Sequence, residues 1–322
     1  MRKWFTRKIA ESSTTSWTPS FYEQHHKLSS MSSKEFFIRR YQQLGWKYKD
    51  VSLRKAIRIN TMNAEKRAIL QRLQSVGITL EKVSFLDNGY WVCESKFSVG
   101  ATSEYLLGLY SVQEVAAQIP VTLFAELQEK TVLDACAAPG GKTVQLADSM
   151  RNTGAIIALD VRIQRLTALA NHLERCCVKN AVVYSLDARQ VSRLKAGFDR
   201  VLLDVPCSGN FVADKNWFKR RKIEDVERNA LLQREILAET VKVLRNDGEM
   251  VYSTCSLEPE ENELNIEWAL KNLGLQVEKI NCYGQKALTN VFGKHLDGSI
   301  ENCRRIWPGQ TQGFFVCKLK RR

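Results

Sequence analysis

From residue 131 onwards, short apolar segments alternate with longer amphipathic ones, and this alternation constrains the fold more than any other feature of the chain. Continuous apolar strands separated by helices indicate a parallel sheet that is covered on both faces. The sequence therefore predicts a doubly wound α/β domain. Its strands are expected over residues 131–135, 155–160, 181–186, 199–205 and 249–254, its helices over 142–150, 163–176 and 224–244, and a further edge strand over 314–319.

A smaller α+β unit is expected ahead of this domain. Ser32 and Glu35 have the spacing of a capping box and predict a helix that ends at Gly45, and a second helix is expected to end at Gly77. We place the boundary at residue 105, so that residues 1–105 and 106–322 form two domains. Within the first, strands are expected over residues 56–60, 78–83 and 90–93, and a linker over 97–104.

The positive charge of the chain is concentrated in its first part. The formal net charge is +13, and residues 1–72 contain 16 Lys and Arg against 5 Asp and Glu. A basic surface attracts phosphates and accelerates encounters with polyanions, so a nucleic-acid partner is favoured. Residues 1–20 are expected to form a tail that contacts nucleic acid rather than a targeting segment. No apolar run approaches the roughly 20 residues needed to cross a bilayer, and no membrane partner is expected.

The nine cysteines are spread along the chain without a Cys-x-x-Cys pair. This spacing argues against a zinc site and, at this chain length, against a disulfide scaffold. Free thiols in this number indicate a reducing compartment. We therefore expect a cytoplasmic protein that binds no metal.

Residues 134–143, Asp-Ala-Cys-Ala-Ala-Pro-Gly-Gly-Lys-Thr, connect the first strand of the larger domain to the helix that follows. Small residues let a ligand approach the backbone, and the start of a helix offers unpaired N–H groups. A Walker phosphate-binding loop requires Gly six positions before Lys142, where this chain has Cys136, and the Gly-x-Gly-x-x-Gly dinucleotide motif is also absent. A tight turn alone would explain only Gly140 and Gly141.

Three consecutive strands are each expected to end at an aspartate. Asp160 follows Asp134 by 26 residues, and Asp187 ends the third strand. An acid in the position of Asp160 can accept hydrogen bonds from both ribose hydroxyls, and Asp187 can meet an adenine amino group. Each aspartate alone could cap a loop, but three at one edge of a parallel sheet predict a nucleoside-binding cleft.

Two cysteines follow the fourth and fifth strands. Cys207 lies in Asp-Val-Pro-Cys-Ser-Gly at residues 204–209, and Cys255 lies in Ser-Thr-Cys-Ser at residues 253–256. Buried cysteines usually act as small inert hydrophobes, and this interpretation explains most of the other seven cysteines. That interpretation is weaker for these two, because both are expected at the ligand edge beside Asp204 and Lys142.

Together these motifs resemble those of the Nop/Sun family of RNA cytosine-5 methyltransferases, and most of all its short archaeal transfer-RNA members. The resemblance extends over residues 57–319. It also includes Arg-Ile-Asn-Thr at 58–61, the segment 108–116 with Gln113 and Glu114, and Gly-Phe-Phe at 313–315. It implies a Rossmann-like class I methyltransferase fold for residues 106–322 and an RNA-binding role for residues 1–105.

The resemblance further implies S-adenosyl-L-methionine as cofactor. Cys255 would be the nucleophile and Cys207 would assist product release, with Asp204 between cofactor and base and Lys142 nearby. Residues 307–312 lack the histidine and acid often found there in relatives, so a base contact from this segment is not expected. The cofactor would be held by Cys136, Ala137, Ala138, Pro139, Gly140, Gly141, Lys142, Asp160, Arg165, Asp187 and Asp204.

These residue types suit the chemistry. C5 of cytosine is a weak nucleophile until a thiolate adds to C6, and a cysteine of pKa ~8.5 is readily activated by a cation such as Lys142. The target base must be unpaired or flipped out of its helix. Residues 215–222 interleave Trp217 and Phe218 with five cations and are expected to face the RNA.

Transfer RNA is the expected substrate by resemblance, with ribosomal RNA as the alternative. A methyltransferase of similar fold that acts on DNA or protein would leave the Thr-Cys pair at 254–255 unexplained. A non-catalytic RNA-binding assembly factor is less favoured because both cysteines are present. No obligate protein partner is evident from the sequence.

Overall fold

A computed structural model describes residues 31–322, and the chain divides into two units after Tyr48. The first unit contains helix α3 (Ser33–Gln43). The Ser32 hydroxyl accepts a hydrogen bond from the Glu35 N–H, and the Glu35 carboxylate accepts one from the Ser32 N–H at 3.0 Å. This capping box confirms the predicted helix start. The tail predicted for residues 1–20 lies outside the described residues.

The second unit begins with a four-stranded antiparallel sheet in the order β2-β3-β1-β4. Its elements are β1 (Ala56–Ile59), α4 (Lys66–Ser75), β2 (Ile78–Lys82), β3 (Gly89–Ser95), α5 (Ser103–Leu106) and β4 (Tyr110–Val112). The expected linker over 97–104 is wrong in part, because it contains a 3₁₀ turn (Val99–Ala101) and the start of α5. The Thr102 hydroxyl accepts from the Tyr105 N–H at 3.0 Å and starts that short helix. The small sheet also draws one strand from beyond residue 105.

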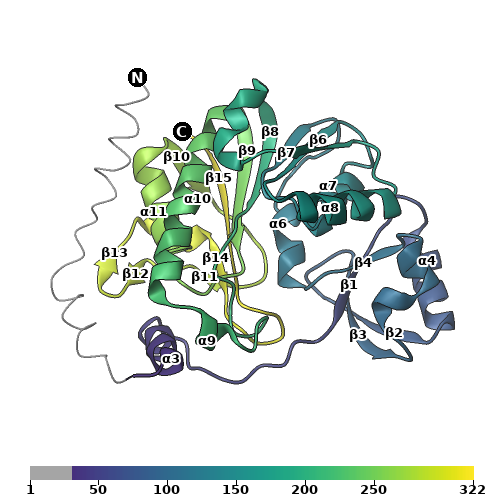
Figure 1. The fold of residues 1–322 in the computed structure, drawn as a ribbon, viewed down its shortest axis with the longest axis horizontal. Coiled ribbons are helices and arrows are strands. Elements are labelled where there is room, and N and C mark those ends of the chain that lie inside the picture. The colour runs from purple at the N-terminus through teal and green to yellow at the C-terminus, as the bar shows by residue number, and fades with distance from the viewer. Residues whose placement is uncertain (1–30) are drawn as a thin grey trace. The chain divides into compact units, whose positions relative to one another are not determined.

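The larger sheet has nine strands in the order β11-β14-β15-β9-β8-β5-β6-β7, with β10 paired to β15 (Figure 1). The five central strands β5 to β9 are parallel, as the sequence predicted. They are β5 (Thr131–Asp134), β6 (Ala155–Asp160), β7 (Ala181–Ser185), β8 (Phe198–Asp204) and β9 (Leu244–Thr254). The chain winds outward from β5 to β7, then returns to place β8 on the other side of β5. In such sheets ligands bind at this reversal, beyond the carboxyl ends of the strands.

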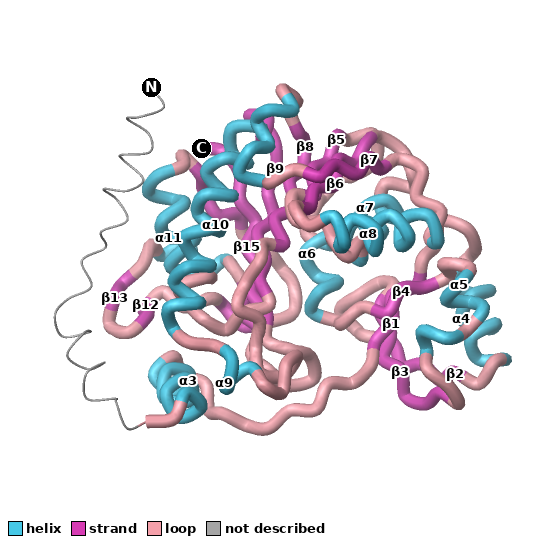
Figure 2. Tube along the Cα trace, viewed as in Figure 1, coloured by secondary structure: helices cyan, strands magenta, loops and turns pink. Residues whose placement is uncertain are grey.

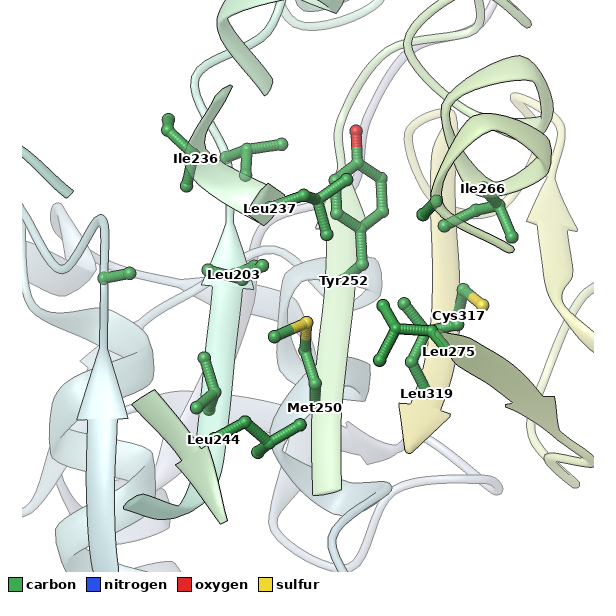
Figure 3. Close-up of a cluster of buried hydrophobic side chains, with 14 of the residues drawn as sticks. Leu203, Ile236, Leu237, Leu244, Met250, Tyr252, Ile266, Leu275, Cys317 and Leu319 are labelled. Carbon is green, nitrogen blue, oxygen red and sulfur yellow. The ribbon is translucent and has the colours of Figure 1, made fainter. Parts of the chain in front are cut away.

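The helices cover both faces of the larger sheet (Figure 1). Along β9, Met250 and Tyr252 pack in the core beneath α10 and α11, whereas Val251 packs in the opposite core with α6 and α7. Figure 3 shows the first of these cores, with the Tyr252 ring inside it and the Tyr252 hydroxyl at its end. The helices are α6 (Ile119–Thr122), α7 (Gly141–Ser149), α8 (Ile163–Arg175), α9 (Trp217–Arg220), α10 (Ile223–Val243) and α11 (Glu263–Asn272).

The expected edge strand at 314–319 is wrong in its position. β15 (Phe314–Arg321) runs antiparallel to β9 inside the sheet, where Phe315 pairs with Thr254. Its other side pairs with β14 (Arg304–Ile306) near one end and with β10 (Leu275–Glu278) near the other. The remaining short strands are β11 (Gln285–Lys286), β12 (Asn290–Val291) and β13 (Lys294–His295).

The small and large sheets share one hydrophobic core. Trp91 of β3 and Leu86 of the preceding turn belong to the same buried cluster as Val132 of β5 and Leu146 of α7. A buried ion pair adds to this junction, because Arg58 of β1 donates to Asp148 of α7 at 3.0 Å. The small sheet is therefore fixed against the larger one. Among residues 31–322, no helix is long and apolar enough to cross a membrane.

Candidate active site

The predicted polar residues lie at the carboxyl ends of the parallel strands. Figure 2 shows these strands, β5 to β9, gathered in one sheet. The strand order places the ends of β7, β6, β5, β8 and β9 side by side. Asp160, Asp134 and Asp204 are the last residues of β6, β5 and β8. Asp187 lies two residues beyond β7, and Cys255 directly follows β9. The edge thus brings together residues that are far apart in the sequence.

Cys207 and Cys255 lie on neighbouring loops at this edge. Their Sγ atoms are 3.2 Å apart, and both side chains are partly exposed. The hydrogen bond with Cys255, together with burial, raises the pKa of the Cys207 thiol well above its ordinary value. Cys207 therefore stays protonated at neutral pH and can donate to the sulfur of Cys255.

Lys142 and Asp204 form an ion pair beside the cysteines, with Nζ and Oδ2 2.7 Å apart. The other Asp204 oxygen accepts from the Ser253 hydroxyl at 2.7 Å, which fixes the carboxylate. Burial lowers the pKa of Lys142, but Asp204 and Cys255 outweigh it, and the net pKa is raised. Lys142 is therefore a permanent cation near the Cys255 sulfur, and it lies 5.8 Å from the centre of the Phe314 ring.

The conformation of the loop at 136–141 depends on Gly140 and on contacts with Arg165. Gly140 precedes α7 with φ +103°, and a Cβ there would lie 2.9 Å from the Leu169 side chain, so glycine is required. Arg165 donates to the Ala138 carbonyl and pairs with Asp160 at 3.3 Å. The structure thus brings the predicted loop, Asp160 and Arg165 into one group at the start of α7.

Asp134 lies beneath this loop and is 1% exposed. Its Oδ2 accepts from the Thr143 hydroxyl at 2.8 Å, and its Oδ1 has no hydrogen-bond partner among the described residues. Burial raises the pKa of Asp134 to about 7, and the nearby Asp204 carboxylate adds to the rise. Burial also raises the pKa of the nearby Cys136 thiol, so Cys136 is a neutral thiol at physiological pH.

Asp187 is hydrogen-bonded to a partner outside this group. Both of its carboxylate oxygens accept from Arg189, at 2.7 Å and 3.1 Å, and Arg189 also pairs with Glu235 of α10. The hydrogen bonds from Arg189 lower the pKa of Asp187. Any adenine amino group would have to share this carboxylate with Arg189.

Sequence reasoning missed two buried residues that hold the cysteine loops. Glu261 accepts from the N–H and the hydroxyl of Ser208, next to Cys207. Asn262 bonds to Thr254 and Ser256, on either side of Cys255. The only signal in the sequence was a polar Glu-Asn pair soon after the Thr-Cys motif, in a position where such residues are normally exposed. Within residues 31–322, no group of three or more His, Cys, Asp or Glu is placed to hold a metal.

The aromatic ring expected to face RNA at Trp217 is buried instead. Trp217 is 1% exposed, and its indole N–H donates to the Ser208 carbonyl at 2.7 Å. Arg221 donates to the same carbonyl at 3.1 Å. These two residues support the Cys207 loop, whereas Lys215 and Lys219 remain exposed.

The segment at 307–312 is tied to the start of the methyltransferase-like part of the chain. The Glu114 carboxylate accepts from the Gln312 N–H at 3.1 Å and from the Ala116 N–H at 2.7 Å. Although these hydrogen bonds oppose it, burial raises the pKa of Glu114. Glu114 therefore fixes a segment that lies almost 200 residues later in the chain.

Comparison with known proteins agrees with this geometry. Residues 121–320 match the family described as 16S rRNA methyltransferase RsmB/F, and residues 20–115 match the N-terminal domain of 16S rRNA methyltransferase RsmF. The human 28S rRNA (cytosine(4447)-C(5))-methyltransferase is 36% identical over 275 residues, which cover 82% of this chain and 34% of the relative. Ribosomal RNA small subunit methyltransferase F of Aeromonas hydrophila is 34% identical over 281 residues, which cover 84% of this chain and 58% of the relative. The chain therefore spans only part of the length of these curated relatives.

Two solved structures from Pyrococcus horikoshii share the fold over nearly the whole chain. A methyltransferase homologue protein is 34% identical with a TM-score of 0.82, covering 95% of this chain and 100% of the other. NSun6, solved with SFG, is 21% identical with a TM-score of 0.75, covering 93% and 97%. The fold is thus that of a Rossmann-like class I methyltransferase with an added N-terminal part. The matches to both parts of the chain confirm the resemblance of its motifs and show that this protein belongs to the RsmB/F family of the Nop/Sun methyltransferases.

Proposed function

We propose that this protein is an S-adenosyl-L-methionine-dependent RNA cytosine-5 methyltransferase that works through a covalent cysteine–base adduct. The observation that carries the proposal is the pair of thiols 3.2 Å apart at the carboxyl edge of the sheet, beside the Lys142–Asp204 ion pair. One nucleophilic thiol and one thiol held protonated suit a reaction in which a carbon–sulfur bond is made and later broken.

Cys255 is the proposed nucleophile. Its thiolate bonds to C6 of the cytosine, which loads electron density onto C5. The Lys142 ammonium interacts electrostatically with the Cys255 sulfur, which is one of the causes that raise the pKa of Lys142. Asp204 holds Lys142 in place and is itself held by Ser253, so the charged groups are ordered before substrate arrives.

Cys207 is the proposed assistant of product release. Release requires loss of the C5 proton to a base and cleavage of the C6–S bond, which returns Cys255 as a thiolate. A neighbouring thiol that stays protonated can donate a hydrogen bond to the departing sulfur. This gives the two cysteines distinct roles in one reaction.

The residues at this edge fit the cofactor. S-Adenosyl-L-methionine supplies an electrophilic methyl group when bound. It carries an ammonium and a sulfonium group, which suit an edge with the acids Asp134, Asp160 and Asp204, and a carboxylate, which suits the N–H groups at the start of α7. The unpartnered, buried Oδ1 of Asp134 fits such a cationic ligand. The predicted holders are therefore kept as a proposal: Cys136, Ala137, Ala138, Pro139, Gly140, Gly141, Lys142, Asp160, Arg165, Asp187 and Asp204.

Ribosomal RNA is the substrate class we favour, ahead of the transfer RNA expected from the motifs. The matched family descriptions and the curated relatives described above are named for ribosomal RNA. The basic N-terminal region, residues 1–105 with 18 Lys and Arg against 9 Asp and Glu, and the exposed Lys215 and Lys219 are proposed to contact the phosphate backbone. All nine cysteines are unpaired, which supports the cytoplasm as the proposed compartment.

The test is bisulfite sequencing of ribosomal RNA and transfer RNA incubated separately with the protein and the cofactor. We expect new 5-methylcytosine at a defined ribosomal position, and none when Cys255 is replaced by Ala. Methylation confined to transfer RNA would reverse the substrate assignment. Absence of 5-methylcytosine from both RNA pools, with cofactor bound, would refute the activity.

A further inference from the structure

Two adjacent buried residues hold the loops that carry Cys207 and Cys255. Glu261 and Asn262 are both fully buried just ahead of α11. Within residues 31–322, no hydrogen bond joins either of these side chains to a cysteine sulfur, and the Cys207 and Cys255 sulfurs hydrogen-bond to each other. Asn262 is hydrogen-bonded to the Cys255 loop. Glu261 is hydrogen-bonded mainly to the Cys207 loop and also accepts from the Ser256 hydroxyl.

Glu261 holds the Cys207 loop. The Ser208 N–H donates to both carboxylate oxygens, at 2.9 Å and 3.2 Å, and the Ser208 hydroxyl donates to Oε2 at 2.7 Å. On the other side of Cys207, the Pro206 carbonyl accepts from Gln233 at 2.8 Å. The backbone on both sides of Cys207 is thus anchored in the protein interior.

Asn262 holds the Cys255 loop in the same way. Its side-chain N–H donates to the Ser256 carbonyl at 3.0 Å, and its side-chain oxygen accepts from the Thr254 hydroxyl at 2.5 Å. These two partners are the immediate neighbours of Cys255. The loops are also joined directly, because Asn210 donates to the Cys255 carbonyl at 2.7 Å.

The position of Glu261 is itself fixed by the core. The single proton of the Tyr252 hydroxyl is shared between the Glu261 carbonyl, at 2.6 Å, and the side-chain oxygen of Gln233, at 2.9 Å. The Tyr252 ring is buried in the core of Figure 3, so the anchor rests on the packed side of β9. Burial raises the pKa of Glu261 to about 7, while hydrogen bonds from Ser256 and Ser208 oppose the rise.

We infer that Glu261 and Asn262 are separate positioning residues for the two steps of the reaction, Glu261 for release through Cys207 and Asn262 for attack through Cys255. The inference rests on the proposed function and adds to it a division of labour between two neighbouring side chains. It follows from the contacts of each side chain. Glu261 accepts from both the N–H and the hydroxyl of Ser208 but only from the hydroxyl of Ser256, so its replacement mainly moves Cys207 away from the adduct. Asn262 holds both neighbours of Cys255, so its replacement moves Cys255 away from C6.

The experiment compares Glu261→Met with Asn262→Leu, two replacements of similar size that remove the hydrogen bonds at equally buried, adjacent positions. Each full-length variant is incubated with substrate RNA and cofactor. Two quantities are measured: the methylated protein–RNA conjugate that survives denaturing electrophoresis, and the free methylated RNA. Cys207→Ala serves as the reference for a stalled conjugate.

For Glu261→Met we expect the ratio of conjugate to free product to rise roughly tenfold, the change that corresponds to about 1.4 kcal/mol and to the loss of one buried hydrogen bond. For Asn262→Leu we expect conjugate and product to fall together, with their ratio unchanged. Glu261→Gln returns an acceptor to the Ser208 N–H and is expected to lie between wild type and Glu261→Met. In the Cys207→Ala background, Glu261→Met should add nothing further.

A merely structural role would make the two variants behave alike, with conjugate and product lost in parallel, and that result would overturn the inference. A wild-type ratio in Glu261→Met would overturn it as well. If Glu261→Met does not fold, Glu261→Gln decides, because its ratio must then exceed that of wild type. Failure of the proposed function is distinguishable, since wild type would then form no 5-methylcytosine and Cys207→Ala no conjugate.

Discussion

The Sγ atoms of Cys207 and Cys255 lie 3.2 Å apart, although the two residues are separated by 48 positions in the chain. Each cysteine follows a different strand, and the two strands, β8 and β9, are parallel neighbours in which Asp204 pairs with Ser253. The register of these strands therefore sets the distance between the two sulfurs.

Replacing the two cysteines separately should give opposite results. Cys255→Ala removes the sulfur that bonds to C6, so both 5-methylcytosine and conjugate should be lost. Cys207→Ala should still methylate but stall as a conjugate visible on a denaturing gel with labelled RNA. Either replacement costs about 1–2 kcal/mol of stability at most, and Cys282→Ala serves as a control that leaves the reaction intact. A conjugate from Cys255→Ala and none from Cys207→Ala would exchange the two roles.

Asp160→Ala should weaken cofactor binding by ~1–3 kcal/mol, because a buried carboxylate that can accept from the ribose is removed. Titration calorimetry with S-adenosyl-L-methionine measures the effect. Asp297→Ala is the matched control, since Asp297 caps a 3₁₀ turn remote in sequence and bonds to Ser299. An unchanged dissociation constant in folded Asp160→Ala would remove Asp160 from the cofactor site.

Asp148→Ala should destabilise the fold by about 3–5 kcal/mol, because it leaves the Arg58 guanidinium buried without its partner. Urea unfolding gives the free energy of unfolding. Glu81→Ala breaks the exposed Arg54–Glu81 pair and should leave the free energy of unfolding almost unchanged, because solvent screens an exposed ion pair. Restoring part of the lost stability with Arg58→Met in the same chain would confirm that the unpaired charge is the cause, whereas equal losses for Asp148→Ala and Glu81→Ala would contradict it.

Asp134 should make stability fall as the pH rises. Its pKa is about 7 in the folded chain and 3.8 as the ordinary value, so between these pH values the folded state holds a proton that the unfolded state has lost. The contribution of Asp134 to stability is therefore fully present below pH 3.8 and declines up to about pH 7. Asp134→Asn mimics the protonated acid, so relative to wild type it should gain stability across this window and level off above it. A pH-independent difference in unfolding free energy, measured without cofactor, would exclude the raised pKa.

Lysines on two surfaces should each contribute to the salt dependence of RNA binding. Lys55→Ala in the small sheet unit and Lys219→Ala after Cys207 should each reduce the slope of log affinity against log salt by about 1, if each side chain neutralises one phosphate. Filter binding over a range of salt concentrations measures this slope. The exposed Lys294 of β13 provides the control. A slope equal to that of wild type in either variant would place that lysine outside the RNA contact.

The sequence alone was sufficient for the parallel core of the sheet but not for its full strand order. The apolar strands and intervening helices from residue 131 have a periodic pattern that predicts a parallel sheet. The strands β10 and β14, which pair with the outer side of β15, have no such pattern because they are only four and three residues long. Because β10 and β14 were not predicted, the strand at 314–319 was expected at the edge of the sheet.

The same limit applies to the active site. Lys142, Asp204, Cys207 and Cys255 were found because each lies in a motif at or after the end of a recognisable strand, and these motifs resemble those of a known family. Glu261 was not, because its burial depends on Ser208, which lies more than 50 residues earlier in the chain. The prediction for Trp217 was wrong for a related reason. An aromatic ring among cations can stack on a base or pack inside its own loop, and the hydrogen bond from the Trp217 indole to the Ser208 carbonyl holds the ring inside the loop.

The core shared by the small and large sheets has a geometric consequence. Because Trp91 and Leu86 are packed with Val132 and Leu146, the small sheet cannot pivot without opening the interior. An RNA segment gripped by the small sheet would then lie at a constant distance from Cys255. In such a rigid arrangement, the nucleotide that reaches the thiol would depend on its spacing from the bound segment as well as on its own base.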